Sequence, residues 1–356
     1  MNTYNIIGLM SGTSLDGVDL TYCTYTKETD NHWKYSILAS QTFDFPEYLL
    51  SSLHNSTELT GSQLVFLDHE LGLFFSDCIL KFITEKQIIK QEIHAIASHG
   101  QTIFHQPDRG ITTQIGNPAV IAVKTEIQTI GDFRTKDVLY GGQGAPLVPI
   151  GDFYLFQNQA DAFINIGGFA NITFHKDGNI HAFDICPANL PLNKLARSKG
   201  LAYDKNGDLA RSGEINYFLL DLLNSLDYYK NSPPKSLGVE WLELNFYPLL
   251  KFDKDVENNL ATMVEHIAVQ LGDICTKNNL KKIMITGGGA KNSFLIERLT
   301  RYFDGELVQV DTRLIDFKEA IIFGLLGALN LNNEPNCIAQ VTGASKNVIG
   351  GVVHQP

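Results

Sequence analysis

The feature that most constrains the fold of this chain is a strand, a glycine turn and a second strand, which occur together twice, at residues 6–20 and 162–174. In both places β-branched and aromatic residues flank a turn of small residues, a pattern that predicts a β-hairpin. Recurrence of the hairpin halfway along 356 residues predicts an internal duplication, in which two domains each contribute one hairpin to a shared cleft.

The first turn reads Ser11-Gly12-Thr13-Ser14-Leu15-Asp16-Gly17. Such a turn exposes backbone N–H groups and hydroxyls, which suit a phosphate. Asp16 is its one charge, and a carboxylate beside a phosphate is favourable chiefly when a divalent cation lies between them. The alternative is an ordinary hairpin with a polar tip.

Composition limits the classes of function. The chain has 28 Lys and Arg against 39 Asp and Glu, a formal net charge of −11, which argues against binding through a nucleic-acid backbone. No apolar run approaches the ~18 residues of a membrane span, and the N-terminus lacks the pattern of a secretory signal. Five scattered cysteines without a CxxC pair are typical of reduced thiols. We therefore expect a soluble, cytoplasmic α/β protein that binds neither nucleic acid nor membrane.

Hydrophobic spacing predicts the main elements. Strands are expected at 35–39 and 42–45, a long amphipathic helix at 63–85, a buried strand at 93–98 and an apolar helix at 317–328. The densest Gly/Pro segment, 140–149, predicts a loop or hinge near a domain boundary. We expect an N-terminal domain at 1–128, completed by 337–356, and a C-terminal domain at 129–336.

A third glycine-rich turn, Thr286-Gly287-Gly288-Gly289-Ala290-Lys291-Asn292, lies between a predicted strand and a predicted helix. This placement lets a nucleotide approach the backbone and the helix N-terminus. The turn is neither GxGxxG nor a Walker A loop, which argues against a dinucleotide-dependent enzyme and a P-loop kinase.

Four single residues each allow two interpretations. Asp184, at a strand end, suits a catalytic base or metal contact but also a helix N-cap. Arg134 could hold an anion or be solvated, and His99, which ends a strand with Gln101 close by, could bind ligand or be structural. Glu319, in the first turn of a predicted helix, could be only a partner of the helix dipole.

Together the motifs resemble the anhydro-N-acetylmuramic acid kinases of the actin/hexokinase/Hsp70-like superfamily, over essentially the whole chain. The motifs that carry the resemblance are, in order, Gly8-Leu9-Met10-Ser11-Gly12-Thr13-Ser14-Leu15-Asp16-Gly17, His99-Gly100-Gln101-Thr102, Gly131-Asp132-Phe133-Arg134, Gly141-Gly142-Gln143-Gly144-Ala145-Pro146, Asn165-Ile166-Gly167-Gly168 and Thr286-Gly287-Gly288-Gly289-Ala290. The resemblance implies two actin-like (ribonuclease H-like) domains with mixed sheets that flank a nucleotide cleft.

The resemblance also implies a reaction. ATP, with Mg²⁺, would phosphorylate O6 of anhydro-N-acetylmuramic acid as its 1,6-anhydro ring is hydrolysed, giving N-acetylmuramate 6-phosphate and ADP in cell-wall recycling by a homodimer. Three residues would be catalytic: Asp184 as the base, Glu319 and Arg134. His99, Gln101, Arg134 and Glu319 would bind the sugar, and Asp16 would face the metal. The nucleotide would be held by Ser11, Gly12, Thr13, Ser14, Asp16, Gly17, Asn165, Gly167, Gly168, Gly287, Gly288, Gly289 and Asn292.

The chain departs from the family pattern beside the catalytic carboxylate. The family usually reads Asp-Thr-Gly-Pro, whereas this chain reads Asp184-Ile185-Cys186-Pro187, and 189–193 lacks an expected acidic residue. A catalytically weakened sugar- or nucleotide-sensing protein of the same fold is therefore the alternative.

Overall fold

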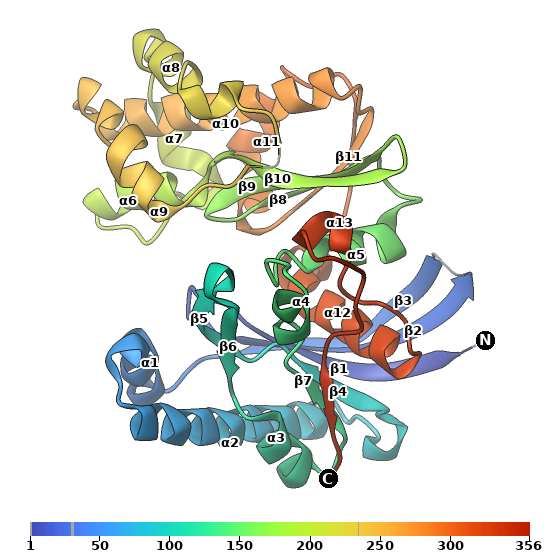
Figure 1. Cartoon of the computed structure of the whole chain (residues 1–356). Coiled ribbons are helices and arrows are strands. Elements are labelled where there is room, and N and C mark those ends of the chain that lie inside the picture. Colours follow the sequence, from blue (N-terminus) through green and yellow to red (C-terminus); the bar gives the residue numbers. More distant parts are fainter. Residues whose placement is uncertain (1, 30–31, 234) are drawn as a thin grey trace. The chain divides into compact units, whose positions relative to one another are not determined.

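The computed structural model describes residues 2–29, 32–233 and 235–356. The chain forms two compact units, Met1–Phe156 with Phe317–Pro356 (unit 1) and Gln157–Asp316 (unit 2). Each unit combines a β-sheet with helices (Figure 1). Both sheets mix parallel and antiparallel strands, so the predicted α/β class with mixed sheets is confirmed.

Unit 1 is built on a six-stranded sheet of order β13-β7-β4-β1-β2-β3, in which β1 pairs antiparallel with β2 and parallel with β4. Its strands are β1 (Thr3–Ser11), β2 (Val18–Thr29), β3 (His32–Phe43), β4 (Ala95–Ser98), β7 (Thr129–Gly131) and β13 (Val352–His354), and β5 (Gln101–Gln106) and β6 (Ile111–Ile115) form a separate hairpin. Its helices are α1 (Glu47–His54), α2 (Gly61–Glu85), α3 (Pro118–Thr125), α4 (Thr135–Leu139), α5 (Val148–Gly151), most of α12 (Thr312–Leu331) and α13 (Ala339–Thr342).

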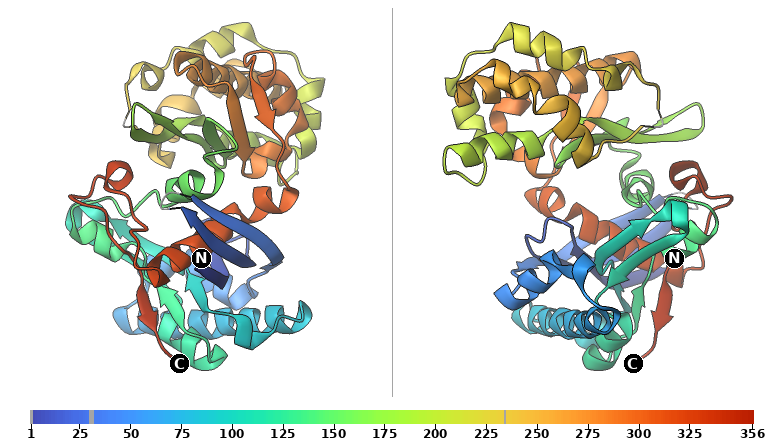
Figure 2. Two further views of the ribbon diagram at one scale, coloured as in Figure 1. Left: turned by 90° about the vertical axis from the view of Figure 1, so that its right-hand side faces the viewer. Right: turned by 60° about the vertical axis from the view of Figure 1, so that its left-hand side comes forward.

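Helices cover both faces of this sheet (Figures 1 and 2). Alternation along β1 sends Ile7 and Leu9 into the apolar core shared with Leu71 and other side chains of α2. The opposite face of β1 meets α12 so closely that a Cβ on Gly8 would lie 2.0 Å from the Ala320 carbonyl oxygen.

The long helix α2 begins and ends where the sequence predicts, within two residues. Thr60 caps it: the Thr60 hydroxyl accepts from the Gln63 N–H, and the Gln63 side chain accepts from the Thr60 N–H. This capping box explains why the helix starts before the first apolar position.

Unit 2 has a five-stranded sheet of order β10-β9-β8-β11-β12. Its strands are β8 (Ala162–Ile166), β9 (Phe169–Lys176), β10 (Asn179–Pro187), β11 (Lys282–Thr286) and β12 (Glu306–Val308), and its helices are α6 (Asn189–Ser198), α7 (Asp208–Ser212), α8 (Tyr217–Asn224), α9 (Val239–Trp241), α10 (Val256–Lys277) and α11 (Ser293–Leu299). The helices gather on one side of the β8–β10 sheet (Figure 1). Ile164, Ile172 and Phe183 of the sheet share their core with buried residues of α10.

Two observations differ from the sequence-based expectations. The strands expected at 35–39 and 42–45 are one strand, β3, which continues through the polar residues between them because β2 pairs along its whole length. The units divide at 156/157 and 316/317 instead of 128/129 and 336/337. The reason is long-range pairing: β7 extends the unit 1 sheet beside β4, and α12 packs on β1.

Candidate functional site

The first glycine hairpin joins β1 to β2 in unit 1. Its tip is closed by a hydrogen bond from the Leu15 N–H to the Gly12 carbonyl (3.2 Å). Gly17 adopts φ +151°, where a Cβ would meet Thr42 and the Phe43 carbonyl. Thr13, Ser14 and Asp16 are exposed, and the Ser14 hydroxyl donates to Asp16 Oδ1 (2.8 Å). The tip thus presents two hydroxyls and one carboxylate to solvent.

Ser11 differs from the other hydroxyl residues of the turn, Thr13 and Ser14, because it is fully buried. Its hydroxyl donates to Oε1 of Gln101, itself only 2% exposed. The Ser11–Gln101 contact therefore ties the end of β1 to the start of β5 and leaves the exposed hydroxyls of Thr13 and Ser14 to face a ligand.

Arg134 and His99 form a hydrogen-bonded pair next to Ser11, the last residue of β1. Arg134 donates from Nη1 to the Gly144 carbonyl (2.7 Å) and from Nε and Nη2 to His99 Nε2 (3.2 and 2.9 Å). His99 is buried, and its Nδ1 lies 3.2 Å from the Ser11 carbonyl. Burial first, and then Arg134, lowers the pKa of His99 to about 3. These three bonds leave two guanidinium N–H groups for an anion or a sugar oxygen.

Glu319 interacts electrostatically with the same cluster. It is the eighth residue of α12, which begins at Thr312 and not at 317, so the expected place in the first helical turn is wrong. Loss of hydration in crowded surroundings raises the pKa of Glu319 above its usual value, and Asp19 and Asp16 add to the rise, whereas Arg134 and Lys318 oppose it. Glu319 nonetheless retains access to solvent.

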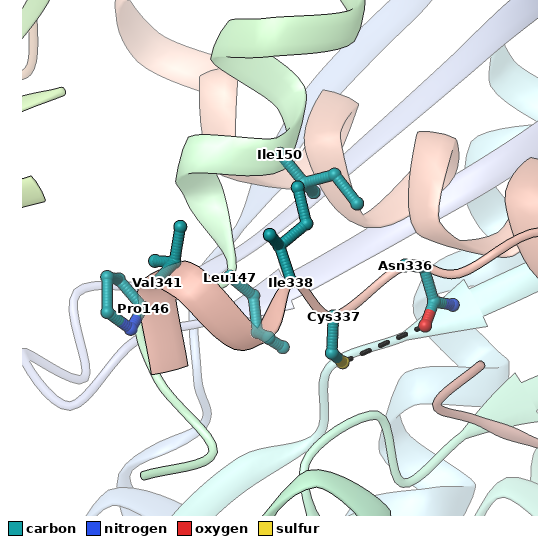
Figure 3. A pocket seen from close by; sticks show the side chains of 7 residues that line it. All are labelled: Pro146, Leu147, Ile150, Asn336, Cys337, Ile338 and Val341. Atoms are coloured by element: carbon teal, nitrogen blue, oxygen red, sulfur yellow. Dashed lines mark hydrogen bonds between the residues drawn. The ribbon is translucent and has the colours of Figure 1, made fainter. Parts of the chain in front are cut away.

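The glycine- and proline-rich segment 140–149 is held in place within unit 1. Buried Asp137 accepts hydrogen bonds from the Gly144 N–H (2.8 Å) and the Thr342 hydroxyl (2.7 Å). Figure 3 shows the gap between this segment, α5 and the C-terminal segment. The gap is lined by Pro146, Leu147, Ile150, Asn336, Cys337, Ile338 and Val341, and it is too small to hold a water molecule. It is a packing contact and not a ligand site. The hydrogen bond to Asp137 holds Gly144, whose carbonyl accepts from Arg134.

In unit 2, the second hairpin and the triple-glycine turn lie side by side. Strands β8 and β11 are parallel neighbours, with Thr286 opposite Asn165, so both turns leave the same edge of the sheet. A Cβ on Gly287, which has φ +81°, would lie 2.6 Å from Asn165 Oδ1, and one on Gly289 would lie 2.2 Å from Ile166. Only glycine permits this approach at the two positions.

Other predicted residues of these turns have structural partners. The Gly167 and Gly168 carbonyls accept hydrogen bonds from the N–H groups of Asn189 and Ala188, at the start of α6 (3.0 and 2.9 Å). Asn292 is the N-cap of α11, its Oδ1 accepting from the Leu295 N–H (3.0 Å).

A row of polar residues crosses the unit 2 sheet. Asp184 on β10 pairs with Asn171 on β9, Asn171 with Asn165 on β8, and Asn165 with Thr286 on β11. The neighbours of these residues along each strand, among them Ile164, Ile172 and Phe183, face the helices. The row therefore belongs to the opposite face of the sheet, and Asn171 is a member that sequence reasoning did not select. Its alternation with apolar neighbours is the signal that would have found it.

Asp184 is held by three hydrogen bonds from outside its sheet. Its N–H donates to the Lys235 carbonyl (3.3 Å), its carbonyl accepts from the Tyr228 hydroxyl (2.6 Å), and Oδ2 accepts from the Leu237 N–H (2.8 Å). Burial raises the pKa of Asp184, and the Leu237 N–H opposes the rise. Among the described residues, none donates to Oδ1, so that oxygen is available to take a proton.

The departure from the family pattern lies in the core. Ile185 is 4% exposed and Cys186 is fully buried, and both belong to the apolar core of unit 2. Neither replacement presents a side chain to the polar row.

The metal-site prediction depends on Asp16. Among the described residues, no three His, Cys, Asp or Glu side chains gather as a metal cage. Mg²⁺ bound to substrate phosphates needs only one or two protein carboxylates, and exposed Asp16 beside the hairpin hydroxyls fits that requirement.

The predicted residues fall into one group per unit. The unit 1 group contains Ser11, Gly12, Thr13, Ser14, Asp16, Gly17, His99, Gln101, Arg134 and Glu319; the unit 2 group contains Asn165, Gly167, Gly168, Asp184, Gly287, Gly288, Gly289 and Asn292.

These glycine hairpins, the polar row and the Arg134–His99 pair fit an enzyme that transfers a phosphoryl group to a sugar alcohol, and the comparisons show that the chain is of this class, a sugar kinase. It belongs to the anhydro-N-acetylmuramic acid kinase family, whose model matches residues 4–356. The resemblance expected from the motifs is therefore confirmed.

Curated relatives extend over nearly the same length. An anhydro-N-acetylmuramic acid kinase of Vibrio parahaemolyticus is 35% identical, over 98% of this chain and 97% of its own. One of Sulfurovum sp. is 36% identical over 99% of both chains, and one of Pasteurella multocida is 36% identical over 99% and 97%.

Solved structures are more distant. The activator of the 2-hydroxyisocaproyl-CoA dehydratase from Clostridium difficile aligns with TM-score 0.45 and 13% identity, over 92% of this chain and 97% of its own. The ROK hexokinase from Thermus thermophilus aligns with TM-score 0.39 and 10% identity, over 92% and 100%.

Proposed function

We propose that this protein uses ATP to open the 1,6-anhydro ring of anhydro-N-acetylmuramic acid and to phosphorylate O6, giving N-acetylmuramate 6-phosphate and ADP in cell-wall recycling. The family match over residues 4–356 supports the substrate class. The observation that carries the proposal is Asp184, half-buried, with Oδ2 held by the Leu237 N–H and Oδ1 left to accept a proton. A general base needs this combination of fixed orientation and one accessible oxygen.

In the proposed reaction, Asp184 removes a proton from a water molecule while the oxygen of that water bonds to the anomeric carbon. The bond from that carbon to O6 breaks, and its electron pair stays on O6. O6 then bonds to the γ-phosphorus, the bond to the β-phosphate oxygen breaks, and ADP leaves. General base catalysis contributes about 10²–10⁴-fold, so positioning and charge neutralisation supply much of the remaining acceleration.

We assign roles to the other residues from the hydrogen-bonding groups and charges that they carry. Thr13 and Ser14, with the turn backbone, contact phosphate oxygens, and the turns at Asn165 and Gly287–Gly289 contact the nucleotide. The free N–H groups of Arg134, held by His99, bind the sugar together with Glu319. Asp16 holds Mg²⁺, which when bound neutralises phosphate charge.

We also propose that the protein is a cytoplasmic homodimer. No helix in the described part of the chain could cross a membrane. The five cysteines are all buried as free thiols, which is compatible with a reducing compartment.

The direct test incubates the purified protein with anhydro-N-acetylmuramic acid, ATP and Mg²⁺ and follows ADP release and sugar phosphate by mass spectrometry. Stoichiometric ADP and N-acetylmuramate 6-phosphate are expected. Binding of both ligands without product over hours would instead favour the sensing protein.

A further inference from the structure

A segment of unit 2, residues 228–233 and 235–237, contacts Asp184 through Tyr228, Lys235 and Leu237, although it belongs to no strand of the sheet. This segment runs from the 3₁₀ helix at Asp227–Lys230 to the connection before α9. All the hydrogen bonds that Asp184 makes at its N–H, carbonyl and Oδ2 go to this segment. Strand β10 is at the edge of its sheet, so the backbone groups on its outer side have no neighbouring strand to bond.

Strand β10 also contains a bulge beside Asp184. The pairing of β10 with β9 shifts register between Asp184 and Cys186, so Ile185 is the extra residue of the bulge, and Asp184, still paired with Asn171, comes directly before it. A bulge leaves local backbone groups outside the ladder and re-aims a side chain. The Lys235 carbonyl and the Tyr228 hydroxyl bond the Asp184 N–H and carbonyl on the open edge of β10, directly before this bulge.

The segment also holds itself together. Lys235 Nζ donates to the Tyr228 carbonyl (3.1 Å) and lies 4.5 Å from the centre of the Tyr228 ring. Tyr228 is buried and contacts the Trp241 ring, with centroids 5.5 Å apart. The segment is thus anchored to the core on one side and to Asp184 on the other.

We propose that residues 228–233 and 235–237 act as a strap that positions the catalytic carboxylate, with the Leu237 N–H fixing Oδ2 and directing Oδ1 towards the reacting water. This inference rests on the proposed function of Asp184 and adds a positioning element to it. The Leu237 N–H also favours the ionised carboxylate, the form that a general base needs. The titratable groups around Asp184 within unit 2 are Cys186 on its own strand, Tyr228 and Lys235.

The experiment compares Leu237→Pro, which removes the N–H donor, with Leu237→Ala, which shortens the side chain and keeps the N–H. The readout is the pKa of Asp184, followed by ¹³C NMR of its carboxyl carbon in the unliganded full chain and assigned with Asp184→Asn. Loss of a hydrogen bond to a charged group predicts a rise of about one pH unit in Leu237→Pro and no change in Leu237→Ala. The acid limb of kcat/KM should move by the same amount.

A second measurement covers the case in which Leu237→Pro does not fold. Hydrogen exchange of the Leu237 amide should accelerate in Asp184→Ala, which lacks an acceptor, and stay protected in Asp184→Asn, which keeps an oxygen. Equal protection of the Leu237 amide in both variants would contradict the positioning role of the strap. A folded Leu237→Pro protein in which Asp184 keeps its wild-type pKa would contradict it as well. If the pKa of Asp184 shifts in Leu237→Pro but the wild-type protein forms no sugar phosphate, the positioning role of the strap is supported and the proposed function is contradicted.

Discussion

Arg134 holds His99 as a neutral imidazole with its proton on Nδ1. Arginine has only donors, so the two N–H groups that point at His99 Nε2 require a lone pair there. The proton then lies on Nδ1 and donates to the Ser11 carbonyl, 3.2 Å away. His99 is therefore a support that orients Arg134, and a histidine in this state is not a proton donor in the reaction.

This state predicts a pH dependence of stability. The pKa of His99 is about 3 in the folded protein and near 6.5 when unfolded, so between these values only the unfolded state takes up the proton. Stability is complete above pH 6.5 and falls as the pH decreases, by about 1.4 kcal/mol per pH unit for this group. Buried His266, whose pKa is also lowered to about 3, adds an equal loss.

Urea denaturation from pH 7.5 to 4.5 checks the effect of His99. His99→Gln should show a shallower decline than the wild-type protein, because one titrating group is gone. His54→Gln, at the exposed end of α1, is the matched control and should follow the wild-type curve. Identical slopes in wild type and His99→Gln would show that His99 is not held neutral.

The contact of β1 with α12 predicts strong sensitivity at Gly8. In Gly8→Ala the new methyl group would lie 2.0 Å from the Ala320 carbonyl oxygen and 3.0 Å from the Gly324 nitrogen, both backbone atoms that cannot rotate away. We expect a loss of about 1–3 kcal/mol or more. Gly61→Ala, at an exposed helix start with no atom within 4 Å, should be neutral or stabilising by up to about 1 kcal/mol. Melting temperatures measure both, and equal values would mean that the two elements do not touch.

We predict that Asp16 contributes to the affinity for the nucleotide only when Mg²⁺ is bound with it. Asp16→Asn keeps the hydrogen bond from Ser14 but removes the charge, so the affinity for a non-hydrolysable ATP analogue with Mg²⁺ should fall about tenfold or more. Asp108→Asn, an exposed carboxylate outside the hairpin, is the control. Calorimetry with and without Mg²⁺ measures the difference; unchanged Mg²⁺ dependence in Asp16→Asn would remove this residue from the metal site.

Elements with a strong local pattern were predictable. The hairpins around Gly12 and Gly167 and the helix α2 follow directly from turn chemistry and apolar spacing. The hairpin of β5 and β6 was not predicted, although its turn, Pro107-Asp108-Arg109-Gly110, carries an ordinary turn signal.

Features that depend on distant contacts were not predictable. The unit boundary depends on β7, only three residues long, whose pairing with β4 no local pattern reveals. The burial of Ser11 and the strap at Leu237 arise from contacts across 90 and 53 residues of sequence. Sequence therefore identified Asp184 as a candidate base but not the groups that hold it.

The measurement that tests the central claim most directly is the rate of ATP-dependent N-acetylmuramate 6-phosphate formation by wild type and Asp184→Asn. We expect an active wild-type protein and a variant that is slower by about 10²–10⁴-fold and binds the ATP analogue with unchanged affinity. Equal rates in the two proteins would contradict the assignment of Asp184 as the catalytic base.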